Sequence, residues 1–297
     1  MDGLIEVPKD YKSGYVALIG RPNVGKSTLL NALIGRKLSI VTHKAQTTRH
    51  RVLGILSEPA YQLILLDTPG ILKPKYKMHE AMMRNVNQAI DDADVLLLMA
   101  DATRDSPDEF ALSHLKGRPT LLLLNKIDLI DPKKALPLAQ AYQEAHPFEA
   151  VLPISALKNR GVDKILDLVL EHIPLGYPFY PPDMVSEHPE RFFVAEIIRE
   201  QIFLGFREEI PFSTAVNIIA YEERSDKKDL INAEIVVERD SQKGILIGKG
   251  GSALKRIGTK ARKEIEAFTE RGVFLQLHVK VRPNWRNRDN LLRSYGY

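Results

Sequence analysis

The residues with the clearest chemical pattern form a glycine-rich run, Gly20-Arg21-Pro22-Asn23-Val24-Gly25-Lys26-Ser27, followed by Thr28. The run fits G-x-x-x-x-G-K-[ST], a loop whose backbone N–H groups surround a polyphosphate. Glycine at Gly20 and Gly25 lets the backbone approach closely, and a following helix N-terminus adds partial positive charge. In this chemistry Lys26 reaches the β- and γ-phosphates, and the Ser27 hydroxyl binds Mg²⁺. The alternative is a chance glycine turn.

A second pattern, further along the chain, is Asp67-Thr68-Pro69-Gly70. It comes directly after an apolar run and therefore at the carboxyl end of a predicted strand, where ligand sites of α/β proteins lie. A carboxylate at Asp67 can hold Mg²⁺ through water, opposite Ser27. The N–H of Gly70 can approach a γ-phosphate because no side chain obstructs it. Asp-x-x-Gly alone is usually a turn, and its place one strand beyond the phosphate loop favours the functional interpretation.

A third pattern, Asn125-Lys126-Ile127-Asp128, indicates which base is bound. The Asp128 carboxylate can accept hydrogen bonds from the ring N1–H and the exocyclic amine of guanine, and adenine offers no N1–H. The Lys126 stem can lie over the ring, while Asn125 can tie neighbouring loops together. The last predicted strand ends in a candidate O6 site, where the N–H of Ala156 could bind, within Ser155-Ala156-Leu157. A helix cap is the alternative, but the order of the three patterns predicts GTP binding.

These patterns need a sheet that brings strand ends together. Apolar runs predict strands at 15–19, 51–56, 61–66, 94–100, 120–124 and 150–154. Helical patterns alternate with them at 27–34, 79–93, from about 107, 133–146 and 162–172. Such alternation predicts an α/β fold with a mostly parallel sheet covered on both faces.

The remaining chain predicts a second, smaller α+β domain. A proline-dense stretch at 176–189 reads as an extended linker. After it come a predicted helix and two strands, at 190–206, 213–222 and 231–238. Helical segments then flank Gly248-Lys249-Gly250-Gly251, and a last strand is expected at 273–281. This order fits the Gly-x-x-Gly module called the KH domain, here of type II.

The glycine loop of this module could approach a nucleic-acid backbone closely. We expect RNA contacts from Ile247, Gly248, Lys249, Gly250, Gly251, Ser252 and Lys255. Apolar walls such as Ile245, Ile247 and Ile257 could cradle unstacked bases. Residues 243–297 contain 13 Lys and Arg against 4 Asp and Glu, a net charge of +9 that suggests a polyanionic partner. A flexible glycine turn and a solvated basic helix face are the alternatives.

Composition excludes several classes of protein. The chain has 297 residues, enough for about two domains, with 44% apolar and 27% charged residues. No apolar run approaches the length of a membrane span, and the N-terminus lacks the basic and apolar segments of a secretory signal. The absence of cysteine excludes disulfides and zinc fingers. The scattered histidines have no metal-ligand spacing, and we expect a cytoplasmic protein.

The motif set resembles the translation-factor-related class of GTPases. In that class a threonine of the mobile segment before the second strand binds Mg²⁺, and Thr48 matches it, with Thr47 as the alternative. The resemblance gives Lys26, Thr48 and Gly70 roles in GTP hydrolysis. It also implies nucleotide contacts throughout the phosphate loop and the other two motifs.

One position departs from the Ras-like pattern. Ile71 follows Gly70, where Ras-like proteins place a glutamine that orients water, so slow unaided hydrolysis is expected. In related GTPases with a hydrophobic residue here, the residue matching Asn23 helps to bind K⁺; an ordinary turn residue is the alternative. Ordering of 36–50 and 71–80 by RNA is the other candidate mechanism. Arg21 and Arg49 are further candidate cations.

Along almost its whole length the chain resembles the Era family of bacterial ribosome-assembly GTPases. With the linker at 176–189, we expect domains at 1–175 and 190–297. The resemblance implies binding of GTP and GDP, and of 16S rRNA near its 3′ end during small (30S) subunit maturation. Some proteins of this family associate peripherally with the inner face of the cell membrane, and we expect a monomer. The alternatives are an RNA-binding protein with a vestigial nucleotide site, and a GTPase whose second domain binds a different RNA, a membrane or a protein.

Overall fold

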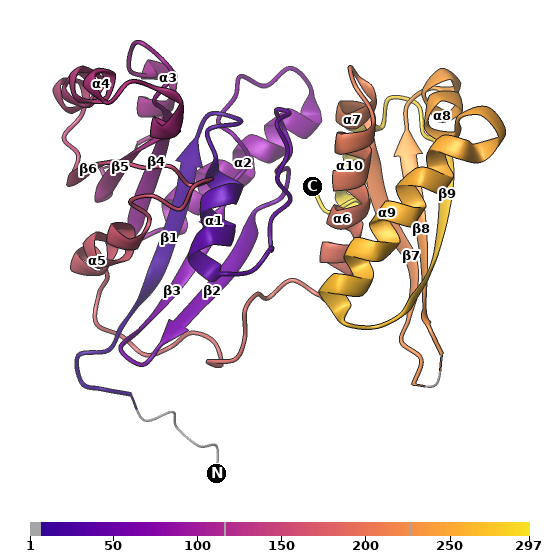
Figure 1. Cartoon of the computed structure of the whole chain (residues 1–297), viewed down its shortest axis with the longest axis horizontal. Helices are drawn as coiled ribbons and strands as arrows, with labels where there is room; N and C mark the ends of the chain where they lie inside the picture. Colours follow the sequence, from indigo (N-terminus) through magenta and orange to yellow (C-terminus); the bar gives the residue numbers. More distant parts are fainter. Residues whose placement is uncertain (1–6, 116, 226) are drawn as a thin grey trace. The chain divides into compact units, whose positions relative to one another are not determined.

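The computed structural model describes residues 7–115, 117–225 and 227–297, and the chain divides into two compact units (Figure 1). The first unit comprises the chain up to Ser39 with Thr48–Lys73 and Met82–Glu187; the second comprises Ile40–Thr47, Pro74–Ala81 and His188–Tyr297. The expectation that no secretory signal is present rests partly on residues 1–6, which lie outside the described residues. No helix within the described ranges is long and apolar enough to cross a membrane.

The first unit is built on a six-stranded sheet with the order β2-β3-β1-β4-β5-β6. Its strands are β1 (Lys12–Gly20), β2 (Val52–Glu58), β3 (Tyr61–Asp67), β4 (Val95–Asp101), β5 (Thr120–Asn125) and β6 (Ala150–Pro153). All neighbours are parallel except β2 and β3, which confirms the predicted mostly parallel sheet. The helices are α1 (Lys26–Ile34), α2 (Lys77–Asp92), α3 (Glu109–Leu112), α4 (Pro132–Ala145) and α5 (Asp163–His172), with a 3₁₀ turn η1 (Ile127–Leu129).

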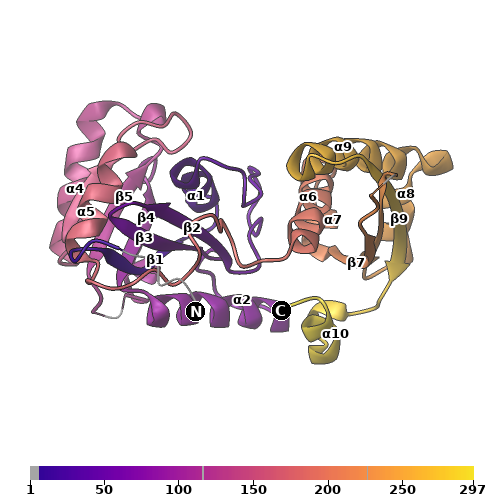
Figure 2. The same ribbon diagram turned by 90° about the horizontal axis from the view of Figure 1, so that it is seen from below.

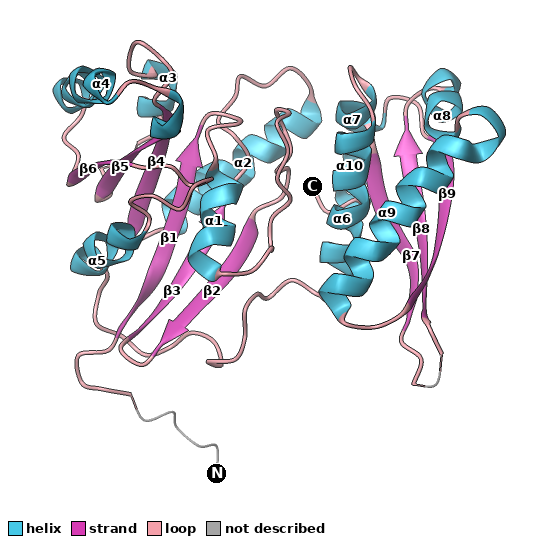
Figure 3. Cartoon of the chain, in the orientation of Figure 1, coloured by secondary structure: helices cyan, strands magenta, loops and turns pink. Residues whose placement is uncertain are grey.

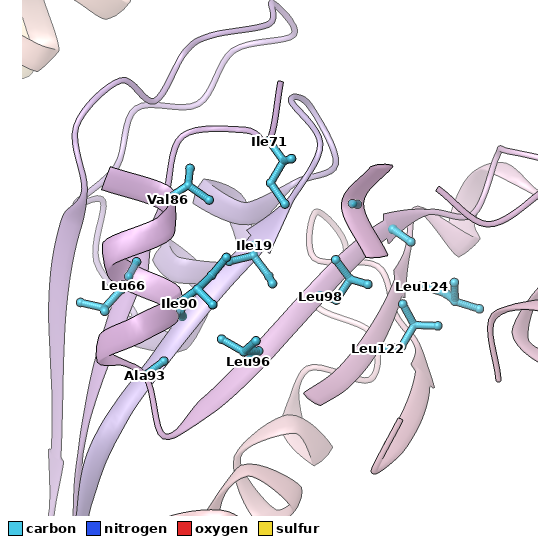
Figure 4. Packing of buried hydrophobic residues seen from close by; sticks show 14 of the residues in the cluster. Ile19, Leu66, Ile71, Val86, Ile90, Ala93, Leu96, Leu98, Leu122 and Leu124 are labelled. Carbon is cyan, nitrogen blue, oxygen red and sulfur yellow. The ribbon is translucent and has the colours of Figure 1, made fainter. Parts of the chain in front are cut away.

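The central strands carry nearly continuous apolar runs because helices cover both faces of the sheet. Figure 2 shows α1 and α2 on opposite faces. On one face, Val86 and Ile90 of α2 join Leu96 and Leu98 of β4 in a buried cluster (Figure 4). Ile71 belongs to the same cluster and is fully buried. The packing fixes the strand ends at which the predicted motifs stand.

Most of the predicted linker belongs to the first unit. The amides of Phe179 and Tyr180 donate to Gln62 Oε1 over 2.7 and 2.9 Å, and Gln62 Nε2 donates to the Tyr180 carbonyl over 2.8 Å. The proline-rich chain is therefore hydrogen-bonded along the sheet, because its extended backbone leaves these groups available. Its division from the second unit falls after Glu187.

The second unit holds a three-stranded sheet with the order β7-β8-β9. Its strands are β7 (Ala215–Glu222), β8 (Asp229–Val237) and β9 (Val273–Val281); β7 and β8 are antiparallel, and β8 and β9 are parallel. The helices are α6 (Glu190–Gly205), α7 (Ile210–Ser213), α8 (Asp240–Ile247), α9 (Ser252–Thr269) and α10 (Asp289–Ser294), with 3₁₀ turns η2 (Lys249–Gly251) and η3 (Trp285–Asn287). Helices α6, α8 and α9 contact the strands (Figure 3). The element order confirms the predicted KH fold.

A segment before Thr48 packs within this second unit against α6. The amide of Val41 donates to Glu200 Oε1 over 3.1 Å, and the Arg199 guanidinium donates to the carbonyl of Thr47. Lys44 Nζ donates to two carbonyls at the C-terminal end of α6, where the helix dipole favours a cation. Charged contacts therefore hold part of the segment that the sequence predicts to be mobile.

The chain after β9 packs against the second unit through aromatic side chains, which the sequence analysis did not predict. Trp285 is fully buried, and its Nε1 donates to the Ser213 carbonyl over 2.9 Å. The rings of Tyr295 and Tyr297 lie 5.6 and 6.0 Å from the Trp285 ring, measured between centroids. The C-terminal tail is therefore part of the core of the second unit.

Candidate nucleotide site and nucleic-acid groove

The phosphate loop joins the end of β1 to the start of α1, as predicted. Gly20 and Gly25 have φ angles of 139° and 106°, and a Cβ at Gly20 would stand 2.3 Å from a backbone oxygen of β4. Lys26 Nζ donates to the carbonyls of Gly20 and Arg21 over 3.1 and 2.9 Å. Burial lowers the pKa of Lys26 to about 8, against the opposing effect of the Asp67 charge. Lys26 therefore keeps most of its positive charge beside the loop at neutral pH.

Three oxygen-bearing side chains converge next to the loop. Ser27 Oγ donates to Asp67 Oδ2 over 2.6 Å and lies 2.7 Å from Thr48 Oγ1, which is 3.4 Å from the same carboxylate oxygen. Asp67 is fully buried, and its Oδ1 has no hydrogen-bond partner among the described residues. Burial raises the pKa of Asp67, against the lowering effects of Ser27 and Lys26. Hard oxygen ligands around an unpaired carboxylate oxygen suit Mg²⁺.

The neighbouring threonine has other partners. Thr47 Oγ1 donates to the Lys44 carbonyl over 2.7 Å and lies 2.6 Å from Thr42 Oγ1. The structure thus brings Thr48, and not Thr47, to Ser27 and Asp67.

The segment after β3 lies directly against the phosphate loop. Thr68 Oγ1 donates to the Leu18 carbonyl over 2.7 Å, and the amide of Ile71 donates to the Gly20 carbonyl over 2.9 Å. A Cβ at Gly70 would come within 2.4 Å of the backbone nitrogen of Pro22. The close approach requires glycine at this position, since every larger residue would displace the segment.

Asn125 ties two loops together, as its motif predicts. Its Nδ2 donates to the Val24 carbonyl over 2.7 Å, and its Oδ1 accepts from the Ala156 amide over 2.9 Å. In this arrangement the Ala156 amide, expected to bind guanine O6, is engaged by Asn125. The side chain of Lys126 reaches Asp101, with Nζ 2.6 Å from Oδ2.

The other residues predicted in the base loops differ in exposure. Asp128 is half-buried, and its carboxylate accepts no hydrogen bond from the described part of the chain. Ser155 is fully buried, whereas Leu157 is 72% exposed. Asp128 and Leu157 are therefore accessible from solvent, whereas Ser155 is not.

The remaining predicted residues of the nucleotide site have varied surroundings. Asn23 is exposed with a φ of 65°, a backbone conformation that asparagine tolerates. Arg49 is fully buried. Val24 and Pro69 are buried, while Pro22 and Thr28 are half-buried.

The second unit carries the predicted glycine loop beside a groove. Gly248, Gly250 and Gly251 all have positive φ angles, of 71°, 59° and 79°, which favour glycine. The groove has a volume of about 420 Å³ and runs between α9 and the edge strand β9. Its lining residues are Lys228, Gly251, Leu254, Lys255, Gly258, Thr259, Arg262, Val273, Phe274, Leu275 and Leu277.

Two of the predicted RNA contacts, Gly251 and Lys255, line this groove, but the predicted apolar walls are different. Ile257 is 2% exposed and belongs to the core, so its assignment as a wall is wrong. Phe274 and Leu277 of β9 were missed. Apolar and polar residues alternate along β9, and this pattern could have identified Leu277, because it places Leu277 on the inner face of the sheet beside α9.

Comparison with known proteins agrees with the predicted GTPase domain and with the predicted KH domain. A family described as 50S ribosome-binding GTPase matches residues 15–126, and the KH domain family matches residues 209–286. The chloroplastic GTPase ERA1 of Zea mays is 50% identical, over 97% of this chain and 71% of its own. The GTPase Era of Ruminiclostridium cellulolyticum is 45% identical, over 97% and 98% of the two chains.

Solved structures of Era proteins are similar to this chain over both domains. An Era variant from Aquifex aeolicus bound to GDP and AlF₄⁻ is 43% identical, with a TM-score of 0.92 over 96% of this chain and 99% of its own. An Era structure in complex with MgGDPNP and nucleotides 1506–1542 of 16S ribosomal RNA is also 43% identical, with a TM-score of 0.93 over 97% and 99%. Identity at this level over nearly complete chains, with the same order of domains, shows that this chain belongs to the Era family of GTPases.

Proposed function

We propose that the protein binds GTP with Mg²⁺ at the phosphate loop, hydrolyses it to GDP and phosphate, and binds 16S rRNA near its 3′ end during assembly of the small ribosomal subunit. The observation that carries the nucleotide half is the convergence of Ser27, Thr48 and Asp67 beside the loop. The basic groove beside the glycine loop supports the RNA half. The Era structure that holds both kinds of ligand supports their combination.

The residues of the site have separate tasks in this proposal. Ser27 and Thr48 would hold Mg²⁺ through their hydroxyls, and Asp67 through water; the ion, when bound, would neutralise charge on the phosphates. Lys26 binds the same phosphates, and the Gly70 amide donates to the γ-phosphate. Phosphoryl transfer depends mainly on such positioning and charge stabilisation.

Orientation of the attacking water is left to groups other than the side chain after Gly70. Ile71 is buried in the core, so backbone groups or a segment outside the motifs must orient the water. For the charge between the β- and γ-phosphates, we propose K⁺ held partly by Asn23. Ordering of 36–50 and 71–80 by RNA is the competing mechanism.

Guanine selectivity rests on Asp128. Calorimetry should give tight GTP binding and much weaker ATP binding, and Asp128→Asn should shift preference towards xanthine nucleotides because the hydrogen-bonding group is inverted. Asp131→Asn is a matched control, since Asp131 caps α4 through its side chain and asparagine preserves such a cap. No GTP affinity, or equal ATP affinity, would refute the nucleotide half.

The RNA half is tested with single-stranded RNA that carries the 3′-terminal sequence of 16S rRNA. Gly250→Asp puts a negative charge into the loop and should weaken filter binding strongly. A Cβ at Gly250 meets no atom within 4 Å, so Gly250→Asn controls for backbone strain without the charge. Arg262→Ala should weaken binding and its dependence on salt, because one phosphate contact is removed. Equal binding by Gly250→Asp and the parent would exclude the glycine loop as part of the RNA site, and equal binding by Arg262→Ala and the parent would count against the groove.

The proposal includes a nucleotide switch. With GTP, Thr48 and the Asp67–Gly70 segment gather on the γ-phosphate, and after hydrolysis they relax. Hydrogen exchange of 36–50 should therefore be slower with a GTP analogue than with GDP, and equal exchange would contradict the switch. We further propose a cytoplasmic monomer whose membrane association is peripheral, which sedimentation with and without vesicles tests.

A further inference from the structure

Arg21 of the phosphate loop makes three contacts within the first unit. Its Nε lies 3.1 Å from Asp108 Oδ2, and its Nη1 donates to the Ile71 carbonyl over 3.3 Å. Its Cζ lies 5.1 Å from the centre of the Phe110 ring, within the range of cation–π attraction. One guanidinium thus joins the phosphate loop to the segment after Gly70 and to the start of α3.

The carboxylate that holds Arg21 is itself fixed. Asp108 caps α3, with its Oδ1 accepting from the Ala111 amide over 3.0 Å. The Asp108 amide donates to the Tyr142 hydroxyl over 3.1 Å. One carboxylate oxygen therefore orients the helix cap while the other orients Arg21, and the guanidinium has a defined direction.

At the other side of Arg21, the backbone of Ile71 is held from both ends. Its amide donates to the Gly20 carbonyl over 2.9 Å, and its carbonyl accepts from Arg21. Its side chain is fully buried in the core. The two peptide groups on either side of Ile71 are thus held, and they restrict the rotation of the neighbouring Gly70, whose amide belongs to the next peptide group.

We propose that Arg21 is a positioning residue for GTP hydrolysis. Through Asp108 and Phe110 it holds the Ile71 carbonyl, and so it orients the backbone of Gly70 and Ile71 against the phosphate loop. This inference rests on the proposed hydrolysis of GTP at the loop. The proposal is motivated by the apolar residue at Ile71. Because this side chain cannot orient the attacking water, orientation of the reacting groups depends on the backbone.

The three contacts distinguish this role from that of a hydrolysis cation. A guanidinium that neutralises the transferring phosphate must direct its donors at the phosphate oxygens. In the structure the donors of Arg21 point to Asp108 and the Ile71 carbonyl. The two roles predict opposite results for Asp108, since removal of that carboxylate impairs a positioning residue but leaves a cation free to act.

The test compares Arg21→Ala, Arg21→Lys and Asp108→Asn in the full chain. We expect Arg21→Ala to lower kcat about tenfold, the loss of a charged hydrogen bond, with GDP affinity and KM within about twofold. Arg21→Lys should give an intermediate kcat, because a point charge cannot serve both partners. Asp108→Asn keeps an effective helix cap and should lower kcat as Arg21→Ala does. The double variant should be no worse than the Arg21 variant.

Arg104→Ala is the matched control, since Arg104 is an exposed arginine of the loop between β4 and α3 and should leave kcat unchanged. Thermal stability should change little in all these variants, because the pair of Arg21 and Asp108 is 42% and 33% exposed. Parental kcat in Arg21→Ala, or in Asp108→Asn alone, would overturn the proposal. Equal losses of kcat and GDP affinity would also overturn it, since Arg21 would then be a general phosphate ligand.

A second measurement does not depend on turnover. Hydrogen exchange of the peptide covering 68–73 should be faster in Arg21→Ala than in the parent and in Arg104→Ala. Unchanged exchange would overturn the positioning role even if the parent hydrolyses GTP. Faster exchange in a parent that hydrolyses no GTP would support the contact and refute the proposed function instead.

Discussion

Replacing Asn125 with alanine should destabilise the first unit by an amount that its two hydrogen bonds define. Asn125 is 3% exposed, and alanine would leave the Val24 carbonyl and the Ala156 amide without their partner. A hydrogen bond contributes about 1 kcal/mol net, and a buried polar group left unpaired costs about 1–3 kcal/mol. We therefore expect the free energy of unfolding to fall by about 3 kcal/mol. For a domain of this size, that corresponds to a lowering of the melting midpoint by about 6–12 °C.

The sequence offers a way to assign this loss to one unit. Trp285, the one tryptophan in the chain, is buried in the second unit, so its fluorescence reports on that unit while circular dichroism reports on both. Asn125→Ala should shift the dichroism transition and leave the fluorescence transition in place. Asp128→Ala is the control, because this half-buried carboxylate accepts no hydrogen bond from the described residues; it should lose guanine selectivity with little change in stability. If the two variants melt alike, the Asn125 amide does not hold the loops together.

Three further outcomes follow from the site. Burial lowers the pKa of Lys26 from 10.5 to about 8, so the folded state loses this proton before the unfolded chain does, and stability rises with pH across that window. In thermal unfolding without added nucleotide, the stability of the parent relative to Lys26→Met should therefore increase between pH 8 and 10.5. A stability difference that is constant over this range would contradict the pKa shift. Asn23→Ala should abolish the advantage of KCl over NaCl at equal ionic strength; parental turnover in both salts would refute the potassium role. Gly70→Ala should lower kcat on the order of 100-fold, because its Cβ would clash with Pro22, and a normal kcat would show that the segment can move away.

Much of the nucleotide site could be predicted because its motifs stand at strand ends. Buried parallel strands read as apolar runs, so the ends of β1, β3 and β5 were located to within a residue or two. The phosphate loop, Asp67 and Asn125 then had to lie along one edge of the sheet. The choice between Thr47 and Thr48 needed the structure, because both are buried and only their partners differ.

The groove between α9 and β9 and the C-terminal tail were predicted less completely, because each depends on contacts between residues distant in sequence. Helical spacing in α9 placed Ile257 in an apolar row, but it did not say that this row faces the core and leaves Lys255 to the groove. Trp285 lies in a polar, basic stretch whose local pattern predicts no core, and its partner Ser213 is far away in the chain. Gln62 likewise gave no sign that the proline-rich segment would hydrogen-bond to it.

The burial of Ile71 has a consequence for attempts to redesign the enzyme. A glutamine introduced there, in imitation of Ras-like proteins, would have to enter an apolar core without a hydrogen-bond partner or swing out and pull its backbone with it. The first choice costs about 1–3 kcal/mol of stability, and the second breaks the hydrogen bond between the Ile71 amide and the Gly20 carbonyl. A change of this one residue therefore affects both the stability of the fold and the rate of hydrolysis. A faster enzyme is more readily obtained by altering what surrounds the attacking water than by restoring the missing side chain.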